Sequence, residues 1–234
     1  MKTKWVYKLK HGASGELKSY NVRLVACGYA QIFGVDFDET YSPVARLTSL
    51  RILFAISAQL RLRIHQMDVD TAFLNAEVSE EIYIKPLEGF PRPPNMNCFR
   101  LKKALYGLKR SPRERYNKIN TFLQQVKFKR LESEPDLYFR QDDEDNAICI
   151  LSLYVDDLVI AGSNLAIINR VKNKLHERHT MKDLGAVNYI LGCEVRHDED
   201  TGTTYVSQYQ FTKSAIEKYF PEDLRECDTH VIQQ

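Results

Sequence analysis

The stretch AICILSLYVDDLVIAG, residues 147–162, decides the fold of this chain. Two apolar runs flank an acidic pair, Asp156 and Asp157, and this pattern predicts a β-hairpin of buried strands with both acids at its turn. Two carboxylates about 4 Å apart repel by roughly 4 kcal/mol at an effective dielectric of about 20. In an ordinary turn such a pair points to water and caps backbone N–H groups. A buried pair instead requires a cation, and hard oxygen ligands select Mg²⁺ or Mn²⁺.

A third acid, Asp68, ends a predicted strand in LRIHQMDVD, residues 62–70. Taken alone, it is equally well explained as a strand-terminating Asp without a role. If this strand neighbours the 147–162 hairpin in one sheet, however, all three carboxylates meet at the same sheet edge. Three such acids can hold two metal ions for displacement at a phosphoryl group, which makes nucleotidyl transfer one hypothesis.

The flanking sequence mixes strand and helix patterns, without a repeat or a low-complexity tract, and predicts one continuous body. Ser111 is the expected N-cap of a helix with Pro112 at its first position, and Ser163 or Asn164 caps the next helix. The other expected elements are a hairpin turning at 12–15, a helix over 48–60, a proline-rich loop over 86–97, a small hairpin within 188–207 and a helix from about 211.

Charge is sorted along the chain, although the formal net charge is only +2. Residues 100–130 contain eleven Lys and Arg side chains against Glu114 alone, and 132–145 contain seven acids against Arg140 alone. A basic stretch of this density is the footprint that a phosphate backbone requires, and it is equally common on a solvated helix face. The sequence contains no apolar run of membrane-spanning length and no secretory signal, so we expect an intracellular protein whose five cysteines are reduced and buried.

Several longer strings carry a resemblance to a known family. YVDD at 154–157 resembles the metal-binding hairpin of reverse transcriptases. HQMDVDTAFLNAEVSEEIYIKPLEGF, ALYGLKRSPRERY, RLVACGYAQIFGVDFDETYSPVARLTSLR and LGAVNYILGCEV resemble the reverse transcriptase of copia-type LTR retrotransposons, in order from Trp5 to about Lys213. The resemblance implies an α+β right-hand polymerase with fingers and a ferredoxin-like palm sheet over 1–213, and a truncated thumb over 214–234.

By the same resemblance, Asp68 and Asp156 bind two Mg²⁺ or Mn²⁺ ions, Asp157 completes the catalytic acids, and the carbonyl of Val69 is a further metal ligand. Phe73 matches an aromatic steric gate that excludes the ribose 2′-hydroxyl, although taken alone it is equally a core aromatic. The implied nucleotide-binding residues are Phe73, Arg23, Thr71, Ala72 and Tyr106. The implied template and primer contacts are Gly107, Lys109, Arg113, Leu191 and Gly192.

The implied partners are an RNA template, a DNA primer and deoxynucleoside triphosphates, with no membrane. The implied location is cytoplasmic, with particle-associated and nuclear stages. We expect the chain to be part of a longer Pol polyprotein whose integrase and ribonuclease H segments lie elsewhere.

Departures from the family pattern support an alternative. Basic finger residues are replaced by Asn21 and Cys27, Asp70 stands where Lys is common, and Glu114 and Arg115 stand where Ala and Trp are usual, which we expect to loosen that helix. The alternative is a decayed or exapted copy that binds nucleic acid or a partner without turnover. An unrelated metal-dependent phosphatase or nuclease does not explain the ordered motifs.

Overall fold

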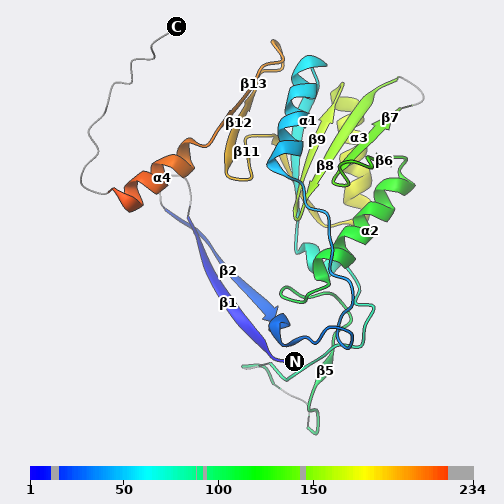
Figure 1. Ribbon diagram of the computed structural model, residues 1–234, viewed down its shortest axis with the longest axis vertical. Coiled ribbons are helices and arrows are strands. Elements are labelled where there is room, and N and C mark those ends of the chain that lie inside the picture. Colours follow the sequence, from blue (N-terminus) through cyan, green and yellow to red (C-terminus); the bar gives the residue numbers. More distant parts are fainter. Residues whose placement is uncertain (12–15, 88, 92–93, 143–145, 221–234) are drawn as a thin grey trace.

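The computed structural model describes residues 1–11, 16–87, 89–91, 94–142 and 146–220, and its centre is a six-stranded antiparallel sheet (Figure 1). The strand order is β10-β3-β9-β8-β7-β6, so the 147–162 hairpin and the strand that contains Asp68 lie side by side, which fulfils the condition under which the three acids would meet. The strands are β3 (Arg63–Val69), β6 (Lys129–Arg130), β7 (Leu137–Gln141), β8 (Ile148–Tyr154), β9 (Asp157–Gly162) and β10 (Met181–Ala186).

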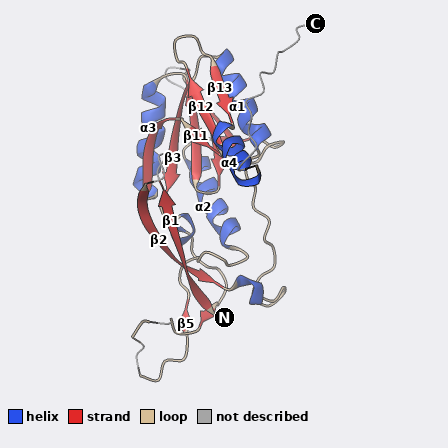
Figure 2. Ribbon diagram, turned by 90° about the vertical axis from the view of Figure 1, so that its left-hand side faces the viewer, coloured by secondary structure: helices blue, strands red, loops and turns tan. Residues whose placement is uncertain are grey.

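Helices cover both faces of this sheet, which explains why the central hairpin is apolar on both sides (Figures 1 and 2). One face packs on α2 (Ser111–Gln125) and α3 (Leu165–Arg178), and the other face packs on α1 (Leu47–Gln59). Leu158 and Ile160 of β9 join the first core cluster, whereas Val159 and Ala161 join the second. The architecture is therefore mixed α/β.

Capping differs from one helix to the next. Asn164 caps α3 as predicted, because its side-chain oxygen accepts from the backbone N–H of Ile167 at 2.9 Å. The prediction for α2 was wrong, since Arg110 occupies the cap position and Ser111 is already helical. The Ser111 hydroxyl instead donates to the Leu105 carbonyl at 2.7 Å and fastens the helix to the preceding segment.

A second, three-stranded sheet and α4 (Tyr209–Tyr219) follow the main sheet in the chain. The strands β11 (Tyr189–Ile190), β12 (Cys193–His197) and β13 (Thr204–Ser207) pair in that order, and Val195 joins the core under α1. None of the side chains of α4 is buried. The domain boundary that we expect at 213/214 falls inside α4 and stays a prediction.

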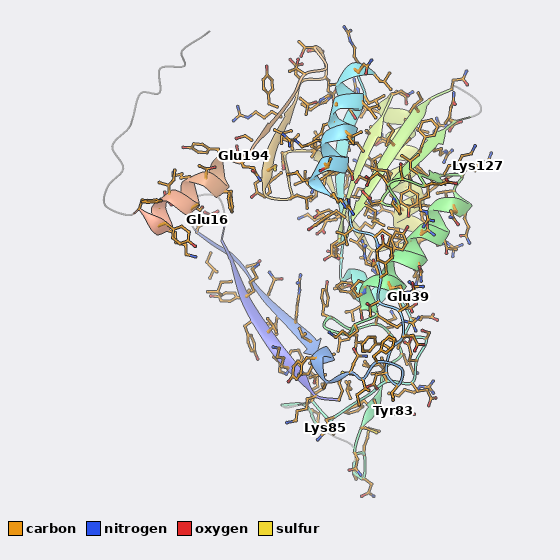
Figure 3. All side chains as sticks on the ribbon, in the orientation of Figure 1. Glu16, Glu39, Tyr83, Lys85, Lys127 and Glu194 are labelled. Carbon is orange, nitrogen blue, oxygen red and sulfur yellow. The ribbon has the colours of Figure 1, made fainter. Side chains whose placement is uncertain are left out.

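The N-terminal strands β1 (Thr3–His11) and β2 (Leu17–Ala26) form a hairpin that extends away from the sheet (Figure 1). Strand alternation gives it one face with Lys4, Lys8 and Arg23 and another with Tyr7 and Tyr20. Its predicted turn at 12–15 lies outside the described residues. At the N-terminal end of β1, the amino group of Met1 donates to the Tyr83 carbonyl, and the N–H of Lys85 donates to the Met1 carbonyl (Figure 3). Tyr83 belongs to a small sheet of β4 (Tyr83–Ile84) and β5 (Phe99–Arg100).

Most elements predicted from sequence are present, with local corrections. Asp157 is the first residue of β9 and not a turn residue. Cys98 is exposed, whereas Cys27, Cys149 and Cys193 are buried free thiols and Cys227 lies outside the described residues. Within the described parts of 86–97 there is no helix or strand, as the prolines predicted. None of the helices in the described ranges has the length and apolar character needed to cross a bilayer.

The packing of Leu158 yields a stability prediction. This side chain has no exposed surface and joins β9 to the helices α2 and α3, directly after Asp157. We expect Leu158→Ala to lower the free energy of unfolding by about 3 kcal/mol, because it leaves a cavity in a close-packed core. Urea unfolding followed by circular dichroism measures this. Leu165→Ala, at a position 39% exposed on α3, is the matched control and should change the value by less than about 0.5 kcal/mol.

Candidate active site

Two aspartates face each other across neighbouring strands at one end of the main sheet. In the antiparallel register of β3 and β9, Asp68 is the direct partner of Asp157. The same cross-strand row continues to Lys182 on β10 and to Tyr154 on β8. Like charges placed directly opposite destabilise a sheet, so this arrangement implies compensating positive charge.

Asp156 lies in the two-residue turn between β8 and β9 and is joined to the neighbouring strand. Its carbonyl oxygen accepts from the backbone N–H of Val69 at 2.8 Å. The preceding residue, Val155, has a φ of 39°, which is strained for a β-branched side chain. The packed sheet on either side maintains this strained turn, and strain of this kind concentrates at functional sites.

The three acids therefore meet at one sheet edge, as predicted, but they do not form a cage of side chains. Within the described ranges, no three His, Cys, Asp or Glu side chains are grouped so that they could hold a metal ion. The Asp157 carboxylate is turned toward β3, where its Oδ1 accepts from Gln66 Nε2 at 3.0 Å. Gln66 was missed from the sequence, although it lies two residues before Asp68 and hence on the same strand face.

The donor set at this edge fits a hard divalent cation. Carboxylate and carbonyl oxygens are the ligands that Mg²⁺ and Mn²⁺ prefer. Asp156 Oδ1 is buried and makes no hydrogen bond to any residue that the structure describes. A buried oxygen without a donor is costly unless a cation or water satisfies it.

The surroundings of Asp156 raise its pKa above the usual value for an aspartate. Burial raises the pKa of this carboxyl, and the negative charge of Asp157 raises it further. The guanidinium groups of Arg115 and Arg23 act in the opposite direction and favour the ionised form. The ionised form of Asp156 therefore depends on these two guanidinium groups.

Tyr106 contacts two other residues that are predicted to bind the nucleotide, Phe73 and Arg23. Phe73 meets Tyr106 edge to face, with ring centroids 4.6 Å apart. The Arg23 guanidinium lies 4.8 Å from the centroid of the Tyr106 ring. Burial raises the pKa of the Tyr106 hydroxyl, and the negative charges of Asp156 and Asp68 raise it further. Arg23 of the β1–β2 hairpin and Phe73 after β3 therefore both contact the ring of Tyr106.

Thr71 and Ala72 connect β3 to this aromatic contact. Thr71 has left-handed backbone angles, with φ 50° and ψ 46°, and its carbonyl accepts from the N–H of Leu74 at 2.8 Å. Ala72 begins the short 3₁₀ helix η2 (Ala72–Asn75) that contains Phe73. The tight turn after β3 thus brings Phe73 back toward Tyr106.

Gly107 lets the hairpin approach the segment before α2 closely. It has a φ of 89°, and a Cβ there would overlap the carbonyl oxygen of Ala26. The N–H of Ala26 in turn donates to the Tyr106 carbonyl at 2.7 Å. Gly28, at the start of the 3₁₀ helix η1 (Gly28–Ala30), packs on Gly107 from the other side. The glycine at 107 is explained by this contact between two protein segments.

The other predicted template and primer residues are more scattered. Arg113 pairs with Glu39 at 2.7 Å, beside the start of α2 (Figure 3), and the backbone N–H of Lys109 donates to Gln31. Leu191 and Gly192, with φ of 51° and 77°, form the turn between β11 and β12.

The helix α2 runs through the unusual pair Glu114 and Arg115 without a break, and the expected loosening stays a prediction. Glu114 accepts from Arg110 at 2.7 Å, one helical turn earlier. Arg115 is 6% exposed and acts electrostatically on Asp156, Asp157 and Asp68. The sequence carried no signal that this side chain turns toward the acids.

Comparison with curated proteins finds transposon polyproteins. The chain is 38% identical over 231 residues to the retrovirus-related Pol polyprotein from transposon TNT 1-94 of Nicotiana tabacum, covering 98% of this chain and 17% of the relative. It is 34% identical over 195 residues to that from transposon RE1 of Arabidopsis thaliana, covering 82% and 13%. A transposon Ty5-1 protein of Saccharomyces cerevisiae is 40% identical over 152 residues, covering 64% and 49%.

Among solved structures, a foamy viral protease-reverse transcriptase in complex with double-stranded DNA matches with a TM-score of 0.42 and 11% identity, over 89% of this chain and 33% of that one. The chain spans only 13–17% of the length of the first Pol polyproteins that it matches. The family model described as reverse transcriptase (RNA-dependent DNA polymerase) matches residues 1–233. With this match and the copia-type motifs in order along it, the chain belongs to the reverse transcriptase family found in transposon Pol polyproteins.

Proposed function

We propose that this chain is an RNA-directed DNA polymerase domain that adds deoxynucleotides to a DNA primer on an RNA template. The observation that supports this most directly is the pairing of Asp68 with Asp157, with Asp156 in the adjoining turn bonded to Val69. The family match favours this function over a non-catalytic copy, and it excludes an unrelated phosphatase or nuclease. The cytoplasmic location and the association with other Pol segments are parts of the same proposal.

In the proposed reaction, the primer 3′-hydroxyl gives up its proton to water and its oxygen bonds to the α-phosphorus of the nucleotide. The bond from that phosphorus to the α,β-bridging oxygen breaks, and pyrophosphate leaves. Asp68, Asp156 and the Val69 carbonyl would hold two Mg²⁺ or Mn²⁺ ions, with Asp157 completing the acidic group. The chemistry that these ions supply is activation of the attacking hydroxyl and neutralisation of the developing charge. Gln66 holds the Asp157 carboxylate in place through its 3.0 Å hydrogen bond.

Nucleotide selection in this proposal depends on the contact between Phe73 and Tyr106. The edge-to-face packing of the two rings restrains Phe73, so its ring can exclude a 2′-hydroxyl. Arg23, beside Tyr106, supplies a cation for the triphosphate. Thr71 and Ala72 present backbone groups next to the same position.

In the terms of a right-hand polymerase, we assign the six-stranded sheet with α1, α2 and α3 to the palm. The β1–β2 hairpin and the segment between η2 and α2 would form the fingers, and α4 would begin the thumb. The basic face of the hairpin supports this assignment, because a template backbone needs positive charge. Gly107, Lys109, Arg113, Leu191 and Gly192 are the proposed template and primer contacts.

The catalytic role of Asp156 can be tested by Asp156→Asn. We expect extension of poly(rA)/oligo(dT) with Mg²⁺ or Mn²⁺ to fall on the order of 1000-fold, because the variant loses a charged ligand worth several kcal/mol in the transition state. Radiolabelled primer extension measures this. The control is Asp200→Asn, at an exposed position in the β12–β13 turn, which should extend as the wild type does. Wild-type-like extension by the Asp156 variant would refute the proposed site.

The proposed role of Phe73 as a steric gate against the ribose 2′-hydroxyl can be tested by Phe73→Ala. We expect the ratio of ribonucleotide to deoxynucleotide incorporation to rise about tenfold or more, since removing the ring opens space for the 2′-hydroxyl. Single-nucleotide insertion with each substrate, compared as kcat/KM, gives the ratio. Phe33→Ala removes an exposed aromatic ring outside the site and should leave the ratio unchanged. An unaltered ratio in Phe73→Ala would show that another residue selects the sugar.

A further inference from the structure

Arg115 is a buried guanidinium whose hydrogen bonds are not all satisfied. It is 6% exposed, and its Nε and Nη2 atoms are buried without a partner among the residues that the structure describes. Placing a charged group in a protein interior is costly unless opposite charge lies close by. The neighbourhood of Arg115 must therefore supply negative charge.

The fold places that negative charge at the end of the main sheet. Arg115 lies in the second turn of α2 and lines a small cavity together with Val69 and Ile119. Val69 follows Asp68 in the chain, and its N–H is bonded to the carbonyl of Asp156. The cavity that Arg115 lines is thus bordered by a residue that is bonded to the turn of Asp156.

The acids in turn depend on Arg115. The charge of Asp156 does most to favour the ionised form of Arg115, and the charges of Asp157 and Asp68 add to it. Burial lowers the pKa of Arg115 to about 10, so the side chain still carries its positive charge at neutral pH. Among the charges near Asp156, that of Arg115 does most to favour its ionised form.

We propose that Arg115 is a built-in counter-charge of the acidic site, which weakens the binding of divalent cations relative to what Asp68, Asp156 and Asp157 would achieve without it. The inference rests on the proposed function, because it takes these acids to be the cation site. Arg115 acts through the electrostatic field at the site and is not itself a catalytic residue. The proposal depends on the charge of Arg115 in the cavity that it shares with Val69, and not on its packing volume.

The test is the affinity for Mn²⁺ alone, measured by the electron paramagnetic resonance signal of free Mn²⁺ on the full chain. Arg115→Met removes the charge and keeps a long side chain, and we expect the Kd for Mn²⁺ to fall about tenfold, because one unit of repulsion is lost at close range. If Arg115→Met does not fold, Arg115→Gln serves as a second neutral variant, for which we expect the same fall in the Kd for Mn²⁺. Arg115→Lys retains the charge and should stay near the wild-type Kd.

The matched control is Lys118→Met. Lys118 is a cation on the same helix that lines the same cavity, but its ammonium donates to the Asn75 carbonyl at 2.6 Å. Its removal should leave the Kd for Mn²⁺ unchanged. Circular dichroism of every variant establishes that the helix is intact.

The outcomes separate the two proposals. If neutral variants at position 115 bind Mn²⁺ no more tightly than the wild type, the role of Arg115 is refuted, while primer extension by the wild type would still support the polymerase. If they bind more tightly and Asp156→Asn abolishes that gain, the counter-charge is supported even where the wild type extends no primer. Tighter binding that survives Asp156→Asn would place the cation elsewhere and overturn the inference.

Discussion

The pairing of β3 with β9 is the constraint on which the site depends, because it sets two aspartates opposite each other at one end of these strands. A shift of one residue in this register would turn every side chain of β3 to the other face. The core prevents that shift, since Met67 must face α2 and α3 while Ile64 faces α1. The apolar packing therefore maintains an arrangement of charges that electrostatics alone disfavours.

Segments far apart in the chain reach this edge through backbone conformations that few residues adopt. Val155 and Thr71, both with positive φ, turn the chain sharply on either side of the acids. Gly107 allows the end of β2 to pack against the segment before α2, and so brings Arg23 to Tyr106. These local strains are tolerated because the six-stranded sheet and its helices hold the ends of each turn.

The basic stretch of 100–130 is less available than its composition indicates. Arg110 is engaged by Glu80 and Glu114, and Arg113 is engaged by Glu39. Arg115 is buried altogether. A nucleic acid that follows this surface would compete with internal ion pairs for some of these side chains, so the count of charges overstates the free positive charge of the folded domain.

The sequence by itself determined the buried 147–162 hairpin, the helices over α1, α2 and α3, and the acids at strand ends, because periodicity and capping are local properties. It also determined the family, through motifs in a fixed order. Only the tertiary structure decided that Asp68 pairs with Asp157, that Gln66 holds that carboxylate, and that Arg115 is buried where its charge acts on the acids. Strand pairing and the burial of a charge are non-local, since they depend on residues distant in the chain whose proximity no periodicity records.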